Sequence, residues 1–311
     1  MDQELLYKNR SVSSCIFAAY KLMGENFKNI FRVTWLPVLL IGIFGSLFML
    51  LNVQDERILS TAIAHPAIYL TLFAIFLIAM LACSVWASAR FLSMLNERPV
   101  KQNLIRVLLL SLNTFAICLV IGLLITGAVF LLKRLLKCDI PTLLYDNWLV
   151  FMIAAIILLI LLLPLTYISV RYLFDEKAHF WTNFLKNYAR GFRHIGFLFL
   201  TFVIAGIITA VLGFIIYLPF SILVLAQSLS TFGVLQGDPS GMPGYILPLM
   251  GITYLVTVIL LWYVSIYLFL VFIFMYGSIE RQRSDRHAIP LASADFMNYP
   301  TTDHDPANPI H

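Results

Sequence analysis

Charged residues are scarce in this sequence of 311 residues. Asp, Glu, Lys and Arg make up 12% of it, against about a quarter in an ordinary soluble protein, and hydrophobic residues make up 61%. No ionisable residue falls in six long apolar runs, at 33–51, 67–89, 107–132, 148–170, 195–218 and 252–278. Each run is close to or above the roughly 20 residues that an α-helix needs to cross about 30 Å of hydrocarbon. The sequence therefore predicts an all-α, polytopic membrane protein, with one six-helix domain over 1–282 and a disordered polar cytoplasmic tail over 283–311.

The absence of charge inside these runs argues against ion-coupled transport. Transporters that couple to protons or ions keep ionisable groups within their helices, where a charge is costly and is retained for function. Among the uncharged polar residues of the runs, Asn113 is the costliest to bury, and we expect it to find a partner across a helix contact. A passive path for a lipid or an uncharged solute stays compatible with the sequence.

Motifs for catalysis and for metal binding are also missing. The sequence has no Walker-type Gly-rich loop, no GxSxG and no HExxH, and its four cysteines form no CxxC pair. The nearest approach to a site is "FDEKAHF", where Asp175 and His179 are four residues apart and Glu176 follows Asp175. A third metal ligand is lacking nearby, so a solvated interfacial helix is the favoured interpretation. We expect no metal, no cofactor and no catalysis.

The basic residues are distributed unevenly between the connections. With the N-terminus placed in the cytoplasm, only four of the 21 Lys and Arg residues lie in outer loops: Arg57, Lys133, Arg134 and Lys137. Such a bias predicts an inner-membrane protein whose N- and C-termini are both cytoplasmic. The net charge of +5 is thereby explained by topology and does not indicate nucleic-acid binding. The expected partners are membrane lipids, chiefly anionic ones, or a protein that binds the cytoplasmic face or tail.

Short stretches recur at the ends of the runs. "WASARFL" at 86–92 and "YISVRYL" at 167–173 share their aromatic, Ser, Arg and Leu positions, and "YGSIERQ" ends the sixth run with Glu280 at the arginine position. Before the first and fifth runs, "NFKNIFR" at 26–32 resembles "NYARGFR" at 187–193. We interpret the chain as three repeated units, each with a cytoplasmic amphipathic helix, an odd-numbered span, an outer loop and an even-numbered span.

Arginines at the cytoplasmic ends of the spans are the candidate functional residues. Arginine fixes the inner end of a span, and basic residues there attract anionic headgroups by roughly 1 kcal/mol each. The predicted interface anchors are Arg32, Arg90, Arg106, Arg171, Arg190 and Arg193. Glu280 is the one acidic residue at a repeated arginine position, and we predict that it pairs with Arg90 or Arg171 at the inner rim.

The segment before the first run has the periodicity of an amphipathic helix. Ile16, Tyr20, Met23, Phe27 and Ile30 follow one another at steps of three or four residues, which places them on one helical face. Such a helix can lie in the membrane interface, or it can pack against the inner face of the bundle. Periodicity alone does not separate these two arrangements.

The stretch "YISVRYLFDEKAHFWTNFLKNYARGFRHIGFLFLTFVI" at 167–204 resembles a known kind of membrane domain. This domain is found fused to some bacterial glycerophosphodiester phosphodiesterases, and also in related stand-alone multi-pass proteins. The residues that carry the likeness are Arg171, Tyr172, Glu176, Arg190, Gly191 and Arg193. Six spans and their connections take up the 311 residues, so the resemblance implies a fold and a lipid-envelope setting, and not hydrolase activity.

Three functions are compatible with these features. The leading hypothesis is a non-enzymatic integral membrane protein of the cell envelope whose basic cytoplasmic collar engages anionic lipid or a protein partner. The alternative is a transporter or permease for a lipid or an uncharged solute. The third is a membrane-embedded enzyme of lipid metabolism that uses Asp175, Glu176 and His179.

Overall fold

A computed structural model describes residues 6–52, 65–136, 148–175, 179–182, 184–237 and 243–297. These residues form α-helices and contain no strand. The helices are α2 (Val12–Leu51), α4 (Pro66–Asn96), α5 (Val100–Leu136), α7 (Trp148–Phe174), α8 (Phe184–Arg193), α9 (Ile195–Leu235) and α10 (Ile246–Met297). All except the short α8 are long and apolar enough to cross a membrane, so the chain has the architecture of a multi-pass membrane protein.

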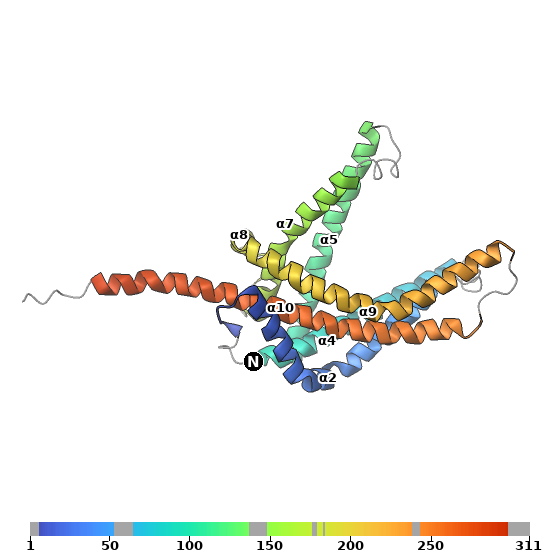
Figure 1. Cartoon of the computed structure of the whole chain (residues 1–311), viewed down its shortest axis with the longest axis horizontal. Coiled ribbons are helices and arrows are strands. Elements are labelled where there is room, and N and C mark those ends of the chain that lie inside the picture. Colours follow the sequence, from blue (N-terminus) through green and yellow to red (C-terminus); the bar gives the residue numbers. More distant parts are fainter. Residues whose placement is uncertain are drawn as a thin grey trace, which may run out of the picture.

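The six long helices form two groups that meet at one end. Helices α2, α4, α9 and α10 lie together, whereas α5 and α7 rise from them at a steep angle (Figure 1). α10 makes its most extensive contacts with α2 and α9, and α4 packs on α2. Between 270 and 279 every residue of α10 except Phe272 is buried, which makes this middle part of α10 the centre of the core. A helix that is apolar on all sides is expected in such a central position.

Small residues allow α2 and α10 to approach each other closely. A Cβ atom at Gly42 would lie 3.2 Å from Cγ1 of Ile259, and Ser46 donates a hydrogen bond of 2.8 Å to the carbonyl of Gly251. The four-residue spacing of Gly42 and Ser46 is the pattern by which membrane helices bring their backbones together. These two residues therefore position the central helix against the first one.

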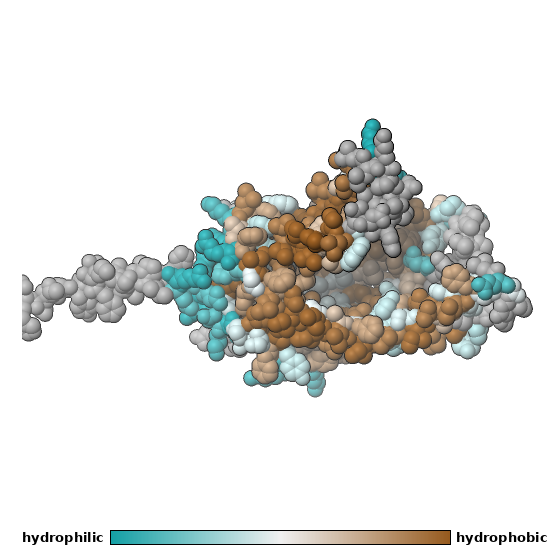
Figure 2. All heavy atoms as spheres, turned by 45° about the horizontal axis from the view of Figure 1, so that its top comes forward, coloured by the Kyte–Doolittle hydropathy of each residue, from teal (hydrophilic) through white to brown (hydrophobic). Residues whose placement is uncertain are grey.

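Most of the remaining surface is apolar. Large side chains such as Phe115, Leu124, Ile157 and Phe214 are exposed along α5, α7 and α9. Apolar colouring covers the body of the molecule, and hydrophilic residues gather at the end from which the C-terminal part of α10 projects (Figure 2). A lipid environment accepts such a surface, because all backbone polar groups of a helix are bonded within it.

Some helices extend beyond the apolar runs of the sequence-based prediction. α2 is continuous from Val12, and α5 begins at Val100, so the first and third spans have no separate amphipathic helix before them. In the described part of the chain, only α8 is such a separate element. The structure therefore does not confirm an amphipathic helix before every odd-numbered span. Charged residues such as Lys21 and Glu25 end the hydrophobic pattern without breaking the helix, and here they form an i,i+4 ion pair of 3.8 Å.

The inward face of α2 is also offset from the predicted stripe. Cys15, Ala19 and Ile30 are buried, whereas Tyr20 and Phe27 are exposed. This part of α2 therefore packs into the protein core through Cys15, Ala19 and Ile30, with Ile16 and Met23 partly buried beside them, and turns Tyr20 and Phe27 outward.

The tail begins later than the sequence predicts. α10 continues to Met297, so positions 283–297 are helical, and 298–311 lie outside the described residues. An ion pair of 3.1 Å between Arg281 and Asp285, one turn apart, supports this continuation.

Candidate functional site: the arginine collar and its cavities

Arg90 contacts a carbonyl group that a proline leaves open. Pro37 lies inside α2 and has no backbone N–H, so the carbonyl of Val33 four residues earlier lacks its helical partner. Nη1 of Arg90, on α4, donates a hydrogen bond of 3.1 Å to this carbonyl. The guanidinium also lies 5.2 Å from the ring centre of Trp86. Arg90 therefore joins α4 to α2 at the proline site.

Two further arginines bind the C-terminal end of α7. Arg98, in the turn between α4 and α5, donates to the carbonyls of Leu173 and Phe174 at 3.3 and 2.7 Å. Arg106 on α5 donates to the carbonyls of Tyr172 and Asp175 at 2.8 and 2.9 Å. The last carbonyls of a helix have no helical donor and carry partial negative charge, so cations are favourable there. Arg98 and Arg106 thus satisfy four such carbonyl groups.

The α4–α5 turn that carries Arg98 is itself held in place. Glu97 ends α4 in the left-handed conformation, with φ of 58°. Asn96 and the buried Asn103 exchange two hydrogen bonds of 3.0 Å across the turn. This reciprocal pair fixes the start of α5 against the end of α4.

Arg171 and Arg190 meet on one buried side chain. Both donate to Oδ1 of Asn187 on α8, and the distance from Arg190 is 3.2 Å. Arg171 also forms an ion pair of 3.7 Å with Asp175. Asn187 is 6% exposed, so its amide oxygen is the buried acceptor that joins α8 to the end of α7.

α8 crosses α7 at a proline. A Cβ atom at Gly191 would lie 3.0 Å from Cβ of Pro164, so a side chain at this crossing would crowd the proline. The hydroxyl of Tyr188 donates a 2.7 Å hydrogen bond to the carbonyl of Leu161, in the turn before the proline. Gly191 and Tyr188 of α8 therefore both contact α7.

Glu280 does not form the predicted pair. Its carboxylate accepts a hydrogen bond from the hydroxyl of the buried Tyr167 and lies 3.6 Å from Arg283. Arg171 is engaged by Asn187 and Asp175, and Arg90 by Val33 on another helix. The prediction of a pair with either arginine is thus replaced by a local i,i+3 pair and a contact from α7 to α10.

The segment before α2 docks on the middle part of α10. The backbone N–H of Arg10 donates to the hydroxyl of Ser278, which in turn donates to the carbonyl of Arg10, both at 3.0 Å. A Cβ atom at Gly277 would lie 2.1 Å from the carbonyl oxygen of Leu6, so only glycine fits there. Burial lowers the pKa of Arg10, whose guanidinium lies over Phe274. In α10, the stretch "YGSIERQ", which resembles the repeated sequence, therefore contacts the N-terminal segment through Gly277 and Ser278.

A second group of cations is exposed. Lys28 and Arg32 on α2, and Lys186 and Arg193 on α8, are exposed, and none has a side-chain hydrogen bond or ion pair within the described ranges. We call these four residues, which lie in the segments before the first and fifth spans, the free cations; Lys8 and Lys101 are exposed cations outside this group. Large apolar side chains are exposed near them, including Phe27, Phe31, Trp35, Leu185 and Phe192. Cations beside exposed aromatic residues are typical of a membrane–water interface.

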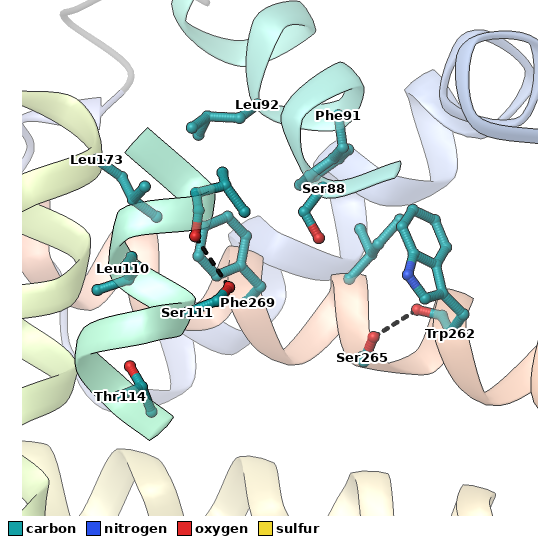
Figure 3. A pocket seen from close by; sticks show the side chains of 12 residues that line it. Ser88, Phe91, Leu92, Leu110, Ser111, Thr114, Leu173, Trp262, Ser265 and Phe269 are labelled. Carbon is teal, nitrogen blue, oxygen red and sulfur yellow. Dashed lines mark hydrogen bonds between the residues drawn. The ribbon is translucent and has the colours of Figure 1, made fainter. Parts of the chain in front are cut away.

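A first cavity, of about 470 Å³, lies between α4, α5 and α10, with Leu173 of α7 at its edge (Figure 3). Phe91, Leu92, Ile266 and Phe269 form much of its apolar wall. Its polar groups are the hydroxyls of Ser88, Ser111, Thr114 and Ser265. Ser111 and Ser265 donate to carbonyls of their own helices, as the dashed lines in Figure 3 show. The cavity is therefore mainly apolar and uncharged.

A second cavity, of about 490 Å³, lies between α2, α4 and α10. Its polar lining consists of Asn26, Asn29 and Arg32, all on α2. Its apolar lining is Leu22, Ile30, Val33, Phe91, Met94, Leu95 and Leu270. Among the cavities described here, this half-open one is the one that a free cation lines beside apolar side chains.

The structure describes two of the three residues of the acidic cluster, Asp175 and His179. Asp175 pairs with Arg171, His179 is exposed, and Glu176 lies outside the described residues. Among the described side chains, no group of three or more His, Cys, Asp or Glu residues is placed to hold a metal ion.

Comparison with known proteins gives no match to a family model, to a curated protein or to a solved structure.

Proposed function

We propose that the chain is a non-enzymatic, multi-pass protein of the inner membrane that engages anionic lipid through its cytoplasmic collar. The division of the basic residues carries this proposal. Arg90, Arg98, Arg106, Arg171 and Arg190 are used inside the protein, on carbonyl groups and on Asn187. The four free cations are left to bind groups outside it, and they stand beside exposed aromatic residues.

The expected strength of this interaction is moderate. At roughly 1 kcal/mol for each cation near an anionic surface, four free cations supply about 4 kcal/mol, and salt weakens the attraction. Because both cation pairs precede odd-numbered spans and belong to α2 and α8, they lie on the same side of the membrane in the proposed topology.

The test compares two variants of equal charge loss. One replaces Lys28, Arg32, Lys186 and Arg193 by glutamine, and the control replaces the four outer-loop basic residues by glutamine. Purified protein in detergent is titrated with phosphatidylglycerol or phosphatidylcholine, and bound lipid is counted by native mass spectrometry. We expect the first variant to lose most phosphatidylglycerol adducts and the control to keep them. Equal binding by both variants contradicts the proposal.

The orientation is tested by labelling. In a cysteine-free variant, a single cysteine replaces Lys186 or Gln236, and intact cells are treated with a membrane-impermeant maleimide. Labelling of the Gln236 position alone is expected, because Gln236 follows α9 at its outer end in the proposed topology. Labelling of Lys186→Cys in intact cells overturns it.

A second candidate function is passage of a lipid or an uncharged solute. The observation that favours it is the first cavity, whose apolar wall carries four hydroxyl groups between α4, α5 and α10. Ser88→Leu reduces this cavity without adding charge. Lipid scrambling or solute flux is measured in proteoliposomes with the wild type and with this variant. Flux by the wild type that the variant loses supports passage. Absence of flux in both proteins excludes it.

A further inference from the structure

The second cavity has the polarity of an amphiphile. Its polar residues lie together on α2, because Asn26, Asn29 and Arg32 follow at steps of three residues. The opposite wall is apolar, and Ile30, Phe91, Leu95 and Leu270 are each at most 5% exposed. A volume of about 490 Å³ is within the roughly 300–1,000 Å³ typical of small-molecule sites.

The charge of the cavity selects an anion. Arg32 is the only ionisable residue in its lining. The nearby Arg90 is engaged by the carbonyl of Val33 and by the ring of Trp86. The lining contains no carboxylate that could receive the ammonium group of a zwitterionic lipid. One available guanidinium therefore matches one phosphodiester charge.

The amide groups extend this polar surface. Asn26 donates one N–H to the carbonyl of Leu22 at 3.1 Å, which fixes the orientation of its side chain. Asn29 has no side-chain hydrogen bond within the described residues and is exposed at the cavity rim. Its amide is available to donate to a phosphate or glycerol oxygen beside Arg32.

We propose that this cavity is a specific site for one anionic phospholipid, with the phosphate on Arg32 and Asn29 and an acyl chain along Met94, Leu95 and Leu270. The site refines the proposed function, on which it rests, by separating one tightly held lipid from the diffuse attraction of the other free cations. The apolar wall makes a lipid, and not a soluble phosphate, the occupant.

Native mass spectrometry of the full chain distinguishes the two kinds of binding. Phosphatidylglycerol should give one adduct that survives detergent exchange, followed by weaker adducts. Arg32→Gln should weaken the first adduct about tenfold, because a charge-assisted hydrogen bond is lost. Arg32→Lys should keep more of it, and Met94→Trp, which fills the apolar part, should remove it. Thermal unfolding without lipid checks that each variant is folded.

The matched control leaves Arg32 in place. Glutamine at Lys28, Lys186 and Arg193 should reduce the weak adducts and preserve the tight one. If the tight adduct is unaffected by Arg32→Gln, or forms equally with phosphatidylcholine, the lipid site is wrong. If glycerol 3-phosphate displaces the lipid at similar concentration, the site is one for soluble phosphate. If the triple variant leaves the weak adducts unchanged, the proposed collar function fails independently.

Discussion

The guanidinium of Arg90 lies 3.1 Å from the backbone carbonyl oxygen of Val33, which is the carbonyl that Pro37 leaves without a helical donor. A helix with an internal proline usually exposes such a group at a kink, where it must find another donor. Here the donor, Arg90, lies on another helix, 57 positions after Val33. The carbonyl that lacks a helical donor in α2 is thus the hydrogen-bond acceptor that links α2 to α4.

Removal of this donor should therefore lower the free energy of unfolding more when the proline is present than when it is replaced. We expect Arg90→Met to lower the free energy of unfolding by about 1–3 kcal/mol, since a buried carbonyl loses a charged donor. In Pro37→Ala, residue 37 regains an N–H and the helix can bond Val33 itself, so the same Arg90→Met change should cost less. Unfolding of all four proteins in detergent gives the coupling energy, and strictly additive costs contradict the assignment.

Gly277 should tolerate no side chain. Gly277→Ala places a methyl group against the carbonyl of Leu6, and we expect the segment around Leu6 and Arg10 to detach from α10, at a cost of about 1–3 kcal/mol. Hydrogen exchange of this segment is the measurement. Gly122→Ala is the matched control, because nothing lies within 4 Å of its Cβ position. Unchanged exchange in Gly277→Ala disproves the docking.

Stability should require a side chain at position 187 that accepts hydrogen bonds. Asn187→Leu keeps the approximate volume but leaves Arg171 and Arg190 without their shared oxygen, and we expect a loss of about 2–3 kcal/mol. Asn187→Asp retains an oxygen at the same place and adds the charge that two guanidinium groups favour. Thermal unfolding in detergent should rank wild type and Asn187→Asp well above Asn187→Leu. A similar loss in both variants contradicts the role of the oxygen.

His194 should make the protein sensitive to acid. Burial, followed by the charges of Arg286 and Arg193, lowers the pKa of this imidazole below its ordinary value of 6.5, and Glu280 opposes them. Below pH 6.5 the unfolded chain therefore binds the proton more readily than the folded one. The stability from neutral His194 is present above this pH and is lost as the pH falls through the lowered folded pKa. We expect His194→Gln to flatten the dependence of the melting temperature on pH between neutral and acidic conditions; parallel curves refute this.

The sequence predicted the six spans well, because hydropathy registers the thickness of hydrocarbon that each helix crosses. It did not place all the ends of the helices, since a helix such as α2 continues through Lys21 and Glu25 where i,i+4 pairs and core contacts support it. Asn113 has a partner, since its amide oxygen accepts a 2.8 Å hydrogen bond from Trp181, but Trp181 lies in the segment before α8 and not on another helix.

The sequence identified most of the arginines of the candidate site but not the groups that they bind. The arginines were expected to face headgroups, but Arg90, Arg106 and Arg171 bind groups of the protein, and only the fold shows that their partners are close. Arg98 was missed as a site residue, although its place directly before Pro99 and α5 marks it as a turn residue near helix ends. Glu280 was assigned a distant partner when Arg283, one turn away, was available.

The attachment of α5 and α7 gives this pair a particular relation to the bilayer. Its buried residues, such as Val107 and Leu173, lie near the end held by Arg98 and Arg106, whereas Leu123 and Ile153 further out are exposed. Beyond their contact with each other, α5 and α7 present these far halves to the surroundings, where lipid chains would cover them in a membrane. Since a helix matches its apolar length to the hydrocarbon by tilting, we expect a change in bilayer thickness to alter the angle of this pair and to act on the α4–α5 turn through Arg98.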